Sequence, residues 1–97
     1  MKIIVIKVDG TLTSEEREHE PALAILQETV GGYVELIKGV LYQDPDDGKQ
    51  HSVFLYVNDE GRLKHLPLNK RATELCGFEL VGNVVVVCRG RRSGRVS

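Results

Sequence analysis

Four consecutive valines, Val84–Val87, constrain the fold of this chain more than any other feature. The turn pair Gly82-Asn83 precedes the run, and Cys88 follows it. Neighbouring side chains of a strand point to opposite faces of the sheet, so an unbroken run of β-branched residues makes both faces apolar. The run therefore predicts a strand that is buried on both faces and lies in the centre of a sheet.

Turn and cap residues divide the first half of the chain into further elements. The β-branched run Lys2–Val8 predicts a buried first strand that ends in a turn at Asp9-Gly10. The acidic, polar residues 14–20 predict a surface loop or the approach to a helix. Pro21 suits the first turn of a helix over about residues 21–30, which should stop at the two glycines that follow. Two short strands are then expected, over Tyr33–Lys38 and Val40–Gln43.

The second half shows turns, strands and one more helix before the valine run. Residues 44–50 (DPDDGKQ) have turn chemistry throughout, and Ser52–Val57 has the composition of a strand. A turn after this strand should close it into a hairpin with Arg62–Leu66. Asn69 is a good N-cap for a short helix, and Gly77 is its natural stop.

These elements predict an α+β fold. We expect a small mixed or antiparallel sheet of about five to six strands with two helices, in the order β-α-β-β-β-β-α-β. The chain has 97 residues, and a split into two domains would leave each half too small to bury a useful core. We therefore expect a single domain over residues 1–88, followed by a flexible, arginine-rich tail over residues 89–97.

The formal net charge of −1 hides an uneven distribution. Residues 1–48 hold 4 Lys/Arg against 10 Asp/Glu and residues 49–97 hold 9 against 4, so the two halves carry −6 and +5. Such an imbalance lets two parts of one fold attract each other, and it also suits a basic face for an anionic ligand. Two isolated cysteines and the lack of a charged leader or a long apolar run favour a cytoplasmic protein without a membrane segment.

One segment is close to a catalytic motif. Asp9-Gly10-Thr11-Leu12-Thr13 directly follows the first strand, as in the D-x-D-G-T-L signature of haloacid dehalogenase phosphotransferases. The nucleophile of that family is an aspartate two residues before Asp9, where this chain has Lys7. Because a lysine cannot form an aspartyl-phosphate, we interpret Asp9-Gly10 as a turn. The residues contain no other catalytic constellation, so we expect a protein that is not an enzyme and needs no cofactor.

The acidic loop and the three histidines lack the pattern of a ligand site. Asp44, Asp46, Asp47 and Gly48 resemble a fragment of a calcium loop, but the ligand expected at its twelfth position is missing and Pro45 constrains the backbone. We expect a solvated hairpin loop without a metal ion. The three histidines stand among polar residues, without a nucleophile at motif spacing, and are expected at the surface.

Two cations stand at a position where a positive charge is unfavourable. Lys70 and Arg71 fall in the first turn of the second predicted helix, at the positive end of its dipole, where cations are mildly unfavourable. Together with the free N–H groups behind Asn69 they would make a site for a phosphate or a carboxylate. The alternative is two solvated side chains whose cost is a few tenths of a kcal/mol.

Three segments carry a combined pattern, namely Leu26–Ile37 (LQETVGGYVELI), Val57–Gly77 (VNDEGRLKHLPLNKRATELCG) and Val81–Cys88 (VGNVVVVC). Their shared elements are a helix followed by V-G-G-Y-(I/V)-E, then N-x-E-G, L-P-x-N-x-x-A-T and a closing G-x-V-V-V strand. This combination, which spans most of residues 1–88, resembles domain-of-unknown-function family 3846, small proteins found mainly in bacteriophages, other viruses and bacteria.

The resemblance implies a viral accessory protein in the cytoplasm of an infected cell, and it carries no settled activity. The positions that it singles out lie at the end of the first helix and around the second: Gly31, Gly32, Tyr33, Glu35, Asn58, Gly61, Pro67, Asn69, Arg71, Ala72 and Thr73.

We therefore expect a non-enzymatic protein that binds and sequesters a small anionic ligand, plausibly a nucleotide immune signal. The residues expected to bind it are Tyr33, Asn69, Lys70, Arg71, Thr73 and Arg89. One alternative is a protein-interaction module that inhibits a host factor through a strand edge or the acidic first half. Another is a nucleic-acid-associated accessory protein that acts through its C-terminal arginines. A homo-oligomer is compatible with each of these.

Overall fold

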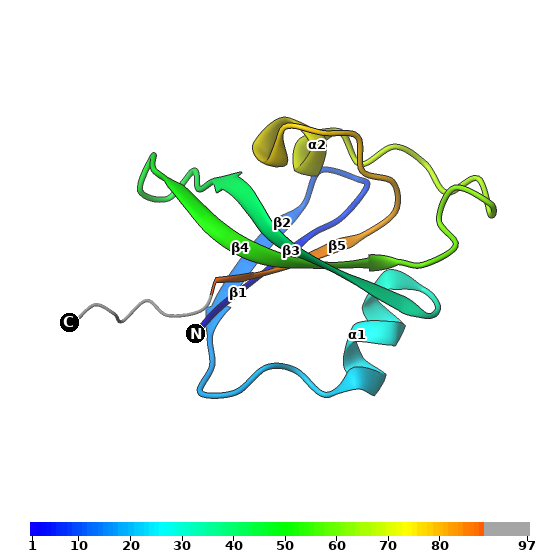
Figure 1. Cartoon of the computed structure of the whole chain (residues 1–97), viewed down its shortest axis with the longest axis horizontal. Coiled ribbons are helices and arrows are strands. Elements are labelled where there is room, and N and C mark those ends of the chain that lie inside the picture. The colour runs from blue at the N-terminus through cyan, green and yellow to red at the C-terminus, as the bar shows by residue number, and fades with distance from the viewer. Residues whose placement is uncertain (89–97) are drawn as a thin grey trace.

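The structure is a computed structural model that describes residues 1–88 (Figure 1). Its elements are β1 (Lys2–Ile6), β2 (Leu12–Glu16), α1 (Leu23–Val30), β3 (Val34–Gln43), β4 (Gln50–Asn58), α2 (Lys70–Cys76) and β5 (Val84–Cys88). Neither of these two helices has the length and the apolar run needed to cross a membrane. The predicted arginine-rich tail, residues 89–97, lies outside the described residues.

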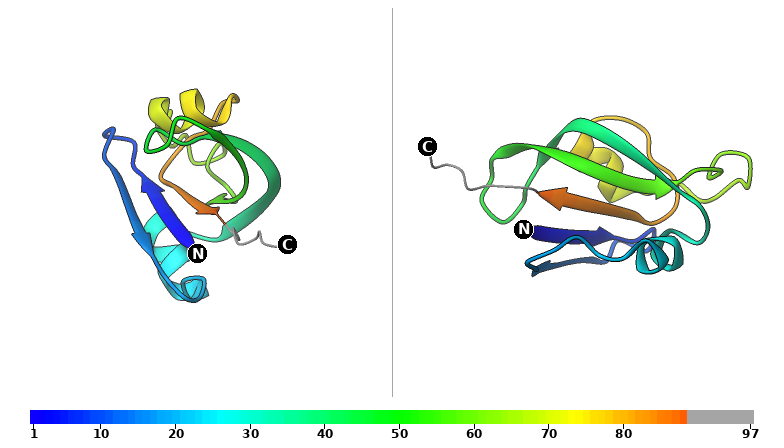
Figure 2. Two further views of the ribbon diagram at one scale, coloured as in Figure 1. Left: turned by 90° about the vertical axis from the view of Figure 1, so that its left-hand side faces the viewer. Right: turned by 60° about the horizontal axis from the view of Figure 1, so that its bottom comes forward.

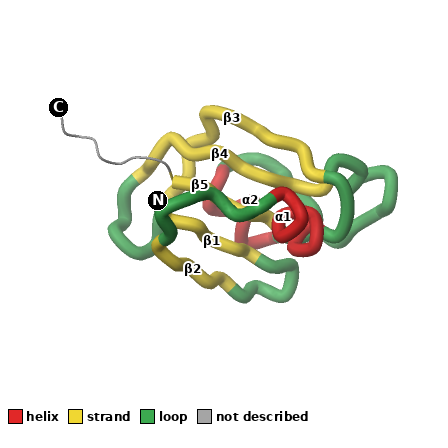
Figure 3. The backbone as a smooth tube through the Cα atoms, turned by 90° about the horizontal axis from the view of Figure 1, so that it is seen from below, coloured by secondary structure: helices red, strands yellow, loops and turns green. Residues whose placement is uncertain are grey.

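The strands form one antiparallel sheet with β5 in the middle. The strand order is β2-β1-β5-β4-β3, so β5 lies between β1 and β4 (Figure 3). It pairs with β1 over its whole length and with β4 over the three positions Phe54–Tyr56. The predicted α+β class and the predicted central place of the valine strand are therefore confirmed.

The four valines of β5 alternate between two cores. Val84 and Val86 belong to the larger core, which lies on the α2 side of the sheet, and Val85 and Val87 belong to the smaller core on the α1 side. All four are at most 1% exposed. Since full burial of a valine stabilises a fold by about 1.5 kcal/mol or more, this strand is a main source of stability.

One short helix covers each face of the sheet (Figure 1). Leu26 and Val30 of α1 pack on one face, and Ala72 and Cys76 of α2 pack on the other. Burial raises the pKa of the Cys76 thiol to about 11, so this thiol stays protonated at neutral pH. The layers are therefore helix, sheet and helix, with a larger core under α2.

The sheet curls toward α2 (Figure 2). Lys2 lies on β1 and Asp44 follows β3, and two other strands separate β1 from β3 in the sheet. The Lys2 Nζ nevertheless lies 2.9 Å from the Oδ2 atom of Asp44. An ion pair this short across four strands requires a strongly curved sheet, whose hollow side the larger core fills.

The buried side chain of Asn69 joins three parts of the chain. Its Nδ2 group donates hydrogen bonds to the carbonyl oxygens of Ile6 (2.8 Å) and Gly82 (2.9 Å). Its Oδ1 atom accepts a hydrogen bond from the backbone N–H of Ala72 at 3.0 Å. Asn69 is therefore the predicted N-cap of α2 and, in addition, the link from α2 to the end of β1 and the start of β5.

The predicted element order is wrong in three places. Residues 12–16 form a strand, β2, although they are polar, because β1 pairs with them and needs an outer neighbour. The two strands expected at 33–38 and 40–43 are one strand, β3, with an irregularity between Ile37 and Val40 where Gly39 has a φ of 69°. Residues 62–66 form turns and not a strand, and His65 has a positive φ of 55°.

The observed order is therefore β-β-α-β-β-α-β. The predicted helix ends are correct, because both Gly31 and Gly77 adopt the left-handed conformation and stop α1 and α2. The first helix begins at Leu23, two residues later than Pro21, and has no side-chain cap at Ala22.

Replacement of Asn69 by alanine should lower the free energy of unfolding by about 2–4 kcal/mol, because it removes a helix cap and leaves two buried carbonyl groups without a donor. Chemical denaturation of the purified protein measures this change. The exposed neighbour Lys70 provides the control, and Lys70→Ala should change the free energy by less than about 0.5 kcal/mol. An equal effect of the two substitutions would contradict the role of Asn69.

Candidate functional site

The residues predicted to bind an anion are not gathered in one place. Lys70 and Arg71 are exposed at the start of α2, and the Arg71 Nη1 group donates a hydrogen bond to the carbonyl oxygen of Gly10 at 3.0 Å. Tyr33 is 70% exposed and lies between α1 and β3. The helix α1 covers the other face of the sheet from α2 (Figure 1). Arg89 lies outside the described residues.

Asn69 and Thr73, two of the residues predicted to bind the ligand, have hydrogen-bond partners within the fold. Asn69 has no exposed surface, and both atoms of its amide group are hydrogen-bonded within the fold. The Thr73 hydroxyl oxygen accepts a hydrogen bond from the backbone N–H of Leu80 at 2.9 Å. Both side chains fix the position of α2, which leaves Lys70 and Arg71 as its exposed cations.

A hollow that the sequence did not predict lies on the α2 side of the sheet, where β4 ends. Residues 57–63, residues 78–81 and two residues of β3, Glu35 and Ile37, line it. Its volume is about 260 Å³. We call this hollow the loop cleft. One of its two loops leads from β4 to α2 and the other from α2 to β5. The shape of the cleft therefore depends on the positions of both loops.

Asn58 holds the first of these loops in place. Its Nδ2 group donates a hydrogen bond to the carbonyl oxygen of Val30 at 3.1 Å, and its Oδ1 atom accepts one from the backbone N–H of Glu60 at 2.8 Å. The loop then folds back on itself, since the backbone N–H of Leu66 donates to the carbonyl oxygen of Gly61 at 2.9 Å. Asn58 thereby ties the end of α1 to one wall of the cleft.

Glycine is required at the closest approach of the two loops. A Cβ atom at Gly61 would lie 2.9 Å from the Cγ2 atom of Val81, which is closer than real Cβ atoms come to their neighbours. The loops also pair through an isolated bridge between Leu68 and Val81. The narrow spacing sets the shape of the cleft, and the family pattern N-x-E-G already pointed to this position.

The cleft combines an apolar wall with an excess of acidic groups. Its charged lining residues are four carboxylates and one guanidinium, namely Glu35, Asp59, Glu60, Glu79 and Arg62. Arg62 pairs with Glu79 at 3.0 Å, and Glu60 lies 3.5 Å from the Lys64 ammonium outside the cleft. Within residues 1–88, Glu35 and Asp59 have no ion-pair partner, so the rim has a negative field.

Two large apolar side chains stand at the same rim. Leu63 is 79% exposed and Phe78 is 40% exposed, and both line the cleft. Ile37 and Val57 from the sheet complete the apolar wall. Exposed large apolar groups beside a hollow mark a surface that can bury area against a partner.

The segments that carry the family pattern meet at this end of the molecule. The backbone N–H of Asp59 donates to the carbonyl oxygen of Tyr33 at 2.8 Å, and that of Gly82 donates to the carbonyl oxygen of Pro67 at 2.8 Å. The whole chain, residues 1–97, matches the family described as Domain of unknown function (DUF3846). The chain belongs to this family. No curated protein and no solved structure matches the chain significantly.

A second polar cluster, which we call the acidic corner, lies at the other end of the β3–β4 hairpin. It consists of Lys2, Asp44, Asp46, Asp47 and His51. The Lys2 ammonium lies 2.9 Å from both the Asp44 and the Asp46 carboxylates. The side chain of Asp44 is only 4% exposed, so the prediction of a fully solvated loop is wrong for this residue.

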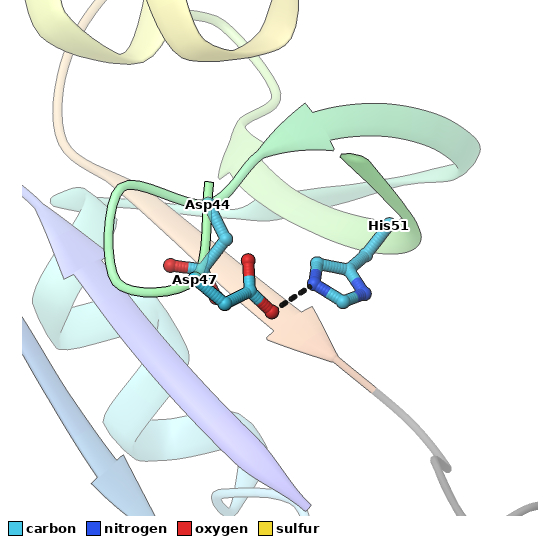
Figure 4. A group of neighbouring side chains, drawn as sticks. All are labelled: Asp44, Asp47 and His51. Carbon is cyan, nitrogen blue, oxygen red and sulfur yellow. Dashed lines mark hydrogen bonds and ion pairs between the residues drawn. The ribbon is translucent and has the colours of Figure 1, made fainter. Parts of the chain in front are cut away.

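The outer part of the acidic corner is the pair Asp47 and His51 (Figure 4). The Nε2 atom of His51 lies 2.8 Å from the Oδ2 atom of Asp47, and the backbone N–H of Lys49 donates to the Oδ1 atom of Asp47 at 2.8 Å. These two hydrogen bonds hold the pKa of Asp47 below its usual range. Asp47 is therefore ionised at neutral pH.

Asp9-Gly10, in the segment close to the phosphotransferase motif, forms a turn as predicted, whereas Leu12 and Thr13 belong to β2. The Oδ1 atom of Asp9 accepts a hydrogen bond from the backbone N–H of Thr11 at 2.8 Å. Hydrogen bonds from Thr11 lower the pKa of the Asp9 carboxyl group. Lys7 is exposed at the position where a phosphotransferase would need its nucleophile.

Replacement of Lys2 by methionine should lower the free energy of unfolding by about 1–3 kcal/mol, because it leaves the buried Asp44 carboxylate without its cation. Burial alone would lower the pKa of Lys2, but hydrogen bonds to Asp46 and Asp44 and their charges raise it. The raised pKa keeps the ammonium charged below strongly alkaline pH, so the loss should be constant across neutral pH.

Denaturant unfolding of Lys2→Met, of Asp44→Asn and of the double variant Lys2→Met/Asp44→Asn measures the effect. The double variant should recover part of the lost stability, because the unpaired charge is gone. A double variant that loses the sum of both single effects would contradict the coupling of Lys2 to Asp44.

Proposed function

We propose that this chain is a non-enzymatic binding protein that takes a basic, apolar segment of a partner protein into the loop cleft. The observation that carries the proposal is the combination at one rim of exposed apolar side chains, Leu63 and Phe78, with the unpaired carboxylates Glu35 and Asp59. One alternative predicted from the sequence is a protein-interaction module that contacts its partner through a strand edge. The proposal keeps this function and places the contact in the loop cleft.

Charge favours a cationic segment over an anionic ligand at this cleft. A carboxylate excess attracts lysine or arginine side chains during encounter and repels phosphate groups. The volume of about 260 Å³ lies below the range of roughly 300–1,000 Å³ typical of small-molecule pockets. It suits one or two side chains of a protein segment that rests across the rim.

The edges of the sheet are less suited to strand addition. The outer strand β2 carries Glu15 and Glu16, and charged residues discourage pairing at an edge. The other outer strand, β3, contains the irregularity at Gly39, which interrupts the regular row of backbone groups. A partner is therefore expected to bind through side chains in the cleft.

Selection of a random peptide library on the immobilised protein should enrich peptides with a leucine, isoleucine or phenylalanine next to lysine or arginine. Phe78→Ala and Glu35→Gln should each weaken the binding of an enriched peptide by roughly tenfold, because both remove contacts at the rim. Leu41 of β3 is 57% exposed outside the cleft, and Leu41→Ala is the matched control. Enrichment of acidic peptides, or binding that survives both substitutions, would contradict the proposal.

The capture of a small anionic ligand is the second candidate, and the cations of α2 favour it. Within residues 1–88 no carboxylate lies within ion-pair distance of Lys70 or Arg71, although the chain has many acids. Cations without an acidic partner keep their attraction for phosphate groups. A nucleotide immune signal remains the specific prediction for this ligand.

A thermal-shift screen against linear and cyclic nucleotides tests this second candidate. A nucleotide at a hundredfold excess over its dissociation constant should stabilise the fold by about 2.7 kcal/mol. Arg71→Ala should abolish the shift, whereas Arg62→Ala, which removes a cation paired with Glu79, should leave it unchanged. A screen in which no nucleotide shifts the melting temperature would rule out this candidate.

A further inference from the structure

We infer that the acidic corner binds one divalent transition-metal ion through Asp44, Asp47 and His51. One donor atom from each residue, two carboxylate oxygens and one imidazole nitrogen, lies within 4.8 Å of the other two. Figure 4 shows the three side chains turned toward one another at the loop that joins β3 to β4. This site is separate from the loop cleft and independent of the proposed function.

The spacing of the donor atoms fits a single ion. Metal–ligand distances for carboxylate oxygen and imidazole nitrogen are about 2.0–2.2 Å, so three donors around one ion stand roughly 3–4 Å apart. The His51 Nε2 and Asp47 Oδ2 atoms are 2.8 Å apart in a hydrogen bond. A small rotation of the half-buried His51 ring would let an ion take the place of this bond without any movement of a strand.

Both carboxylates keep lone pairs for an ion. Asp44 accepts hydrogen bonds from Lys2 at one oxygen and from the backbone N–H of Asp46 at the other. Asp47 accepts from the backbone N–H of Lys49. Since each carboxylate has about four lone-pair sites, these bonds orient the two groups and leave room for a metal bond.

The excess negative charge of the acidic corner also favours the binding of a cation. The corner holds three carboxylates, of which Asp44 and Asp46 share the ammonium group of Lys2, whereas Asp47 pairs with His51. Asp44 is nearly fully buried, and a buried carboxylate is costly unless it is paired. A divalent ion would neutralise the excess that Lys2 leaves.

A second observation, independent of the acids, is the hydroxyl group of Tyr42. Tyr42 has no exposed surface, and its hydroxyl has no hydrogen-bond partner among the described residues. The residue is the strand partner of His51, and it stands two positions before Asp44, so all three point to the same face.

Orphaned buried hydroxyl groups are rare, and each needs an explanation. A water molecule bound to an ion at Asp44 would give the Tyr42 hydroxyl the partner that the protein itself does not provide. The face that carries Asp44 and His51 therefore also carries one unsatisfied polar group, the Tyr42 hydroxyl.

The donor set selects the kind of ion. Imidazole suits zinc, copper, nickel and cobalt, whereas calcium and magnesium prefer sites made of oxygen atoms alone. Three protein ligands leave at least one coordination position for water, as in open zinc sites. Zn²⁺ is therefore the ion to test first, with Ca²⁺ as the ion that an acidic loop without the histidine would favour.

Calorimetric titration of the untagged chain with Zn²⁺ should show one equivalent of binding, tighter than that of Ca²⁺. His51→Ala and Asp47→Asn should each weaken the binding of Zn²⁺ by roughly tenfold or more. Both changes affect partly exposed side chains, so the variants should fold, and circular dichroism checks this. His19→Ala removes an exposed histidine outside the corner and should change nothing.

Substitution by Co²⁺ separates this site from one built on the cysteines. Ligation by oxygen and nitrogen should give visible bands without the near-ultraviolet charge-transfer absorption of a thiolate, and the His51 ring resonances should be the histidine signals that shift. Absence of binding to the wild-type chain, a thiolate band, tighter binding of Ca²⁺, or unchanged affinity in His51→Ala would each overturn the inference.

Discussion

The burial of β5 on both faces is the constraint on which the rest of this structure depends. A strand whose four valines point alternately up and down needs a layer on each side, and the chain supplies one short helix for each. Short helices are marginal by themselves, so their stability comes from packing. Asn69 and Asn58 then connect the two helices to strand and loop backbone, which fixes the loops between them.

Features that depend on a few neighbouring residues could be predicted from the sequence. The glycines that stop both helices, the cap at Asn69 and the central strand each have a local physical cause. The strand β2 could not be predicted, because its polar sequence becomes a strand only by pairing with β1. Likewise, nothing local indicates that Lys2 would meet Asp44, since the curl of the whole sheet brings them together.

The candidate sites also divide into one that a local sequence feature indicates and one that only the fold reveals. Lys70 and Arg71 stood out in the sequence because they break a local rule, and they are exposed in the fold. The loop cleft joins β3 to two loops that follow β4 and α2 in the chain, so only the fold reveals it. The hairpin β3–β4 carries the cleft at one end and the acidic corner at the other, which makes this hairpin the element that positions both.

The central place of β5 has a consequence for synthesis of the protein. β5 is the last described strand in the sequence, yet it joins β1–β2 to β4–β3. Until residue 88 has left the ribosome, the nascent chain can form two hairpins but no continuous sheet, and both inner edges remain unpaired. Early strands of this kind are open to wrong pairing, and the inner edges of β1 and β4 stay exposed to it until β5 has been synthesised.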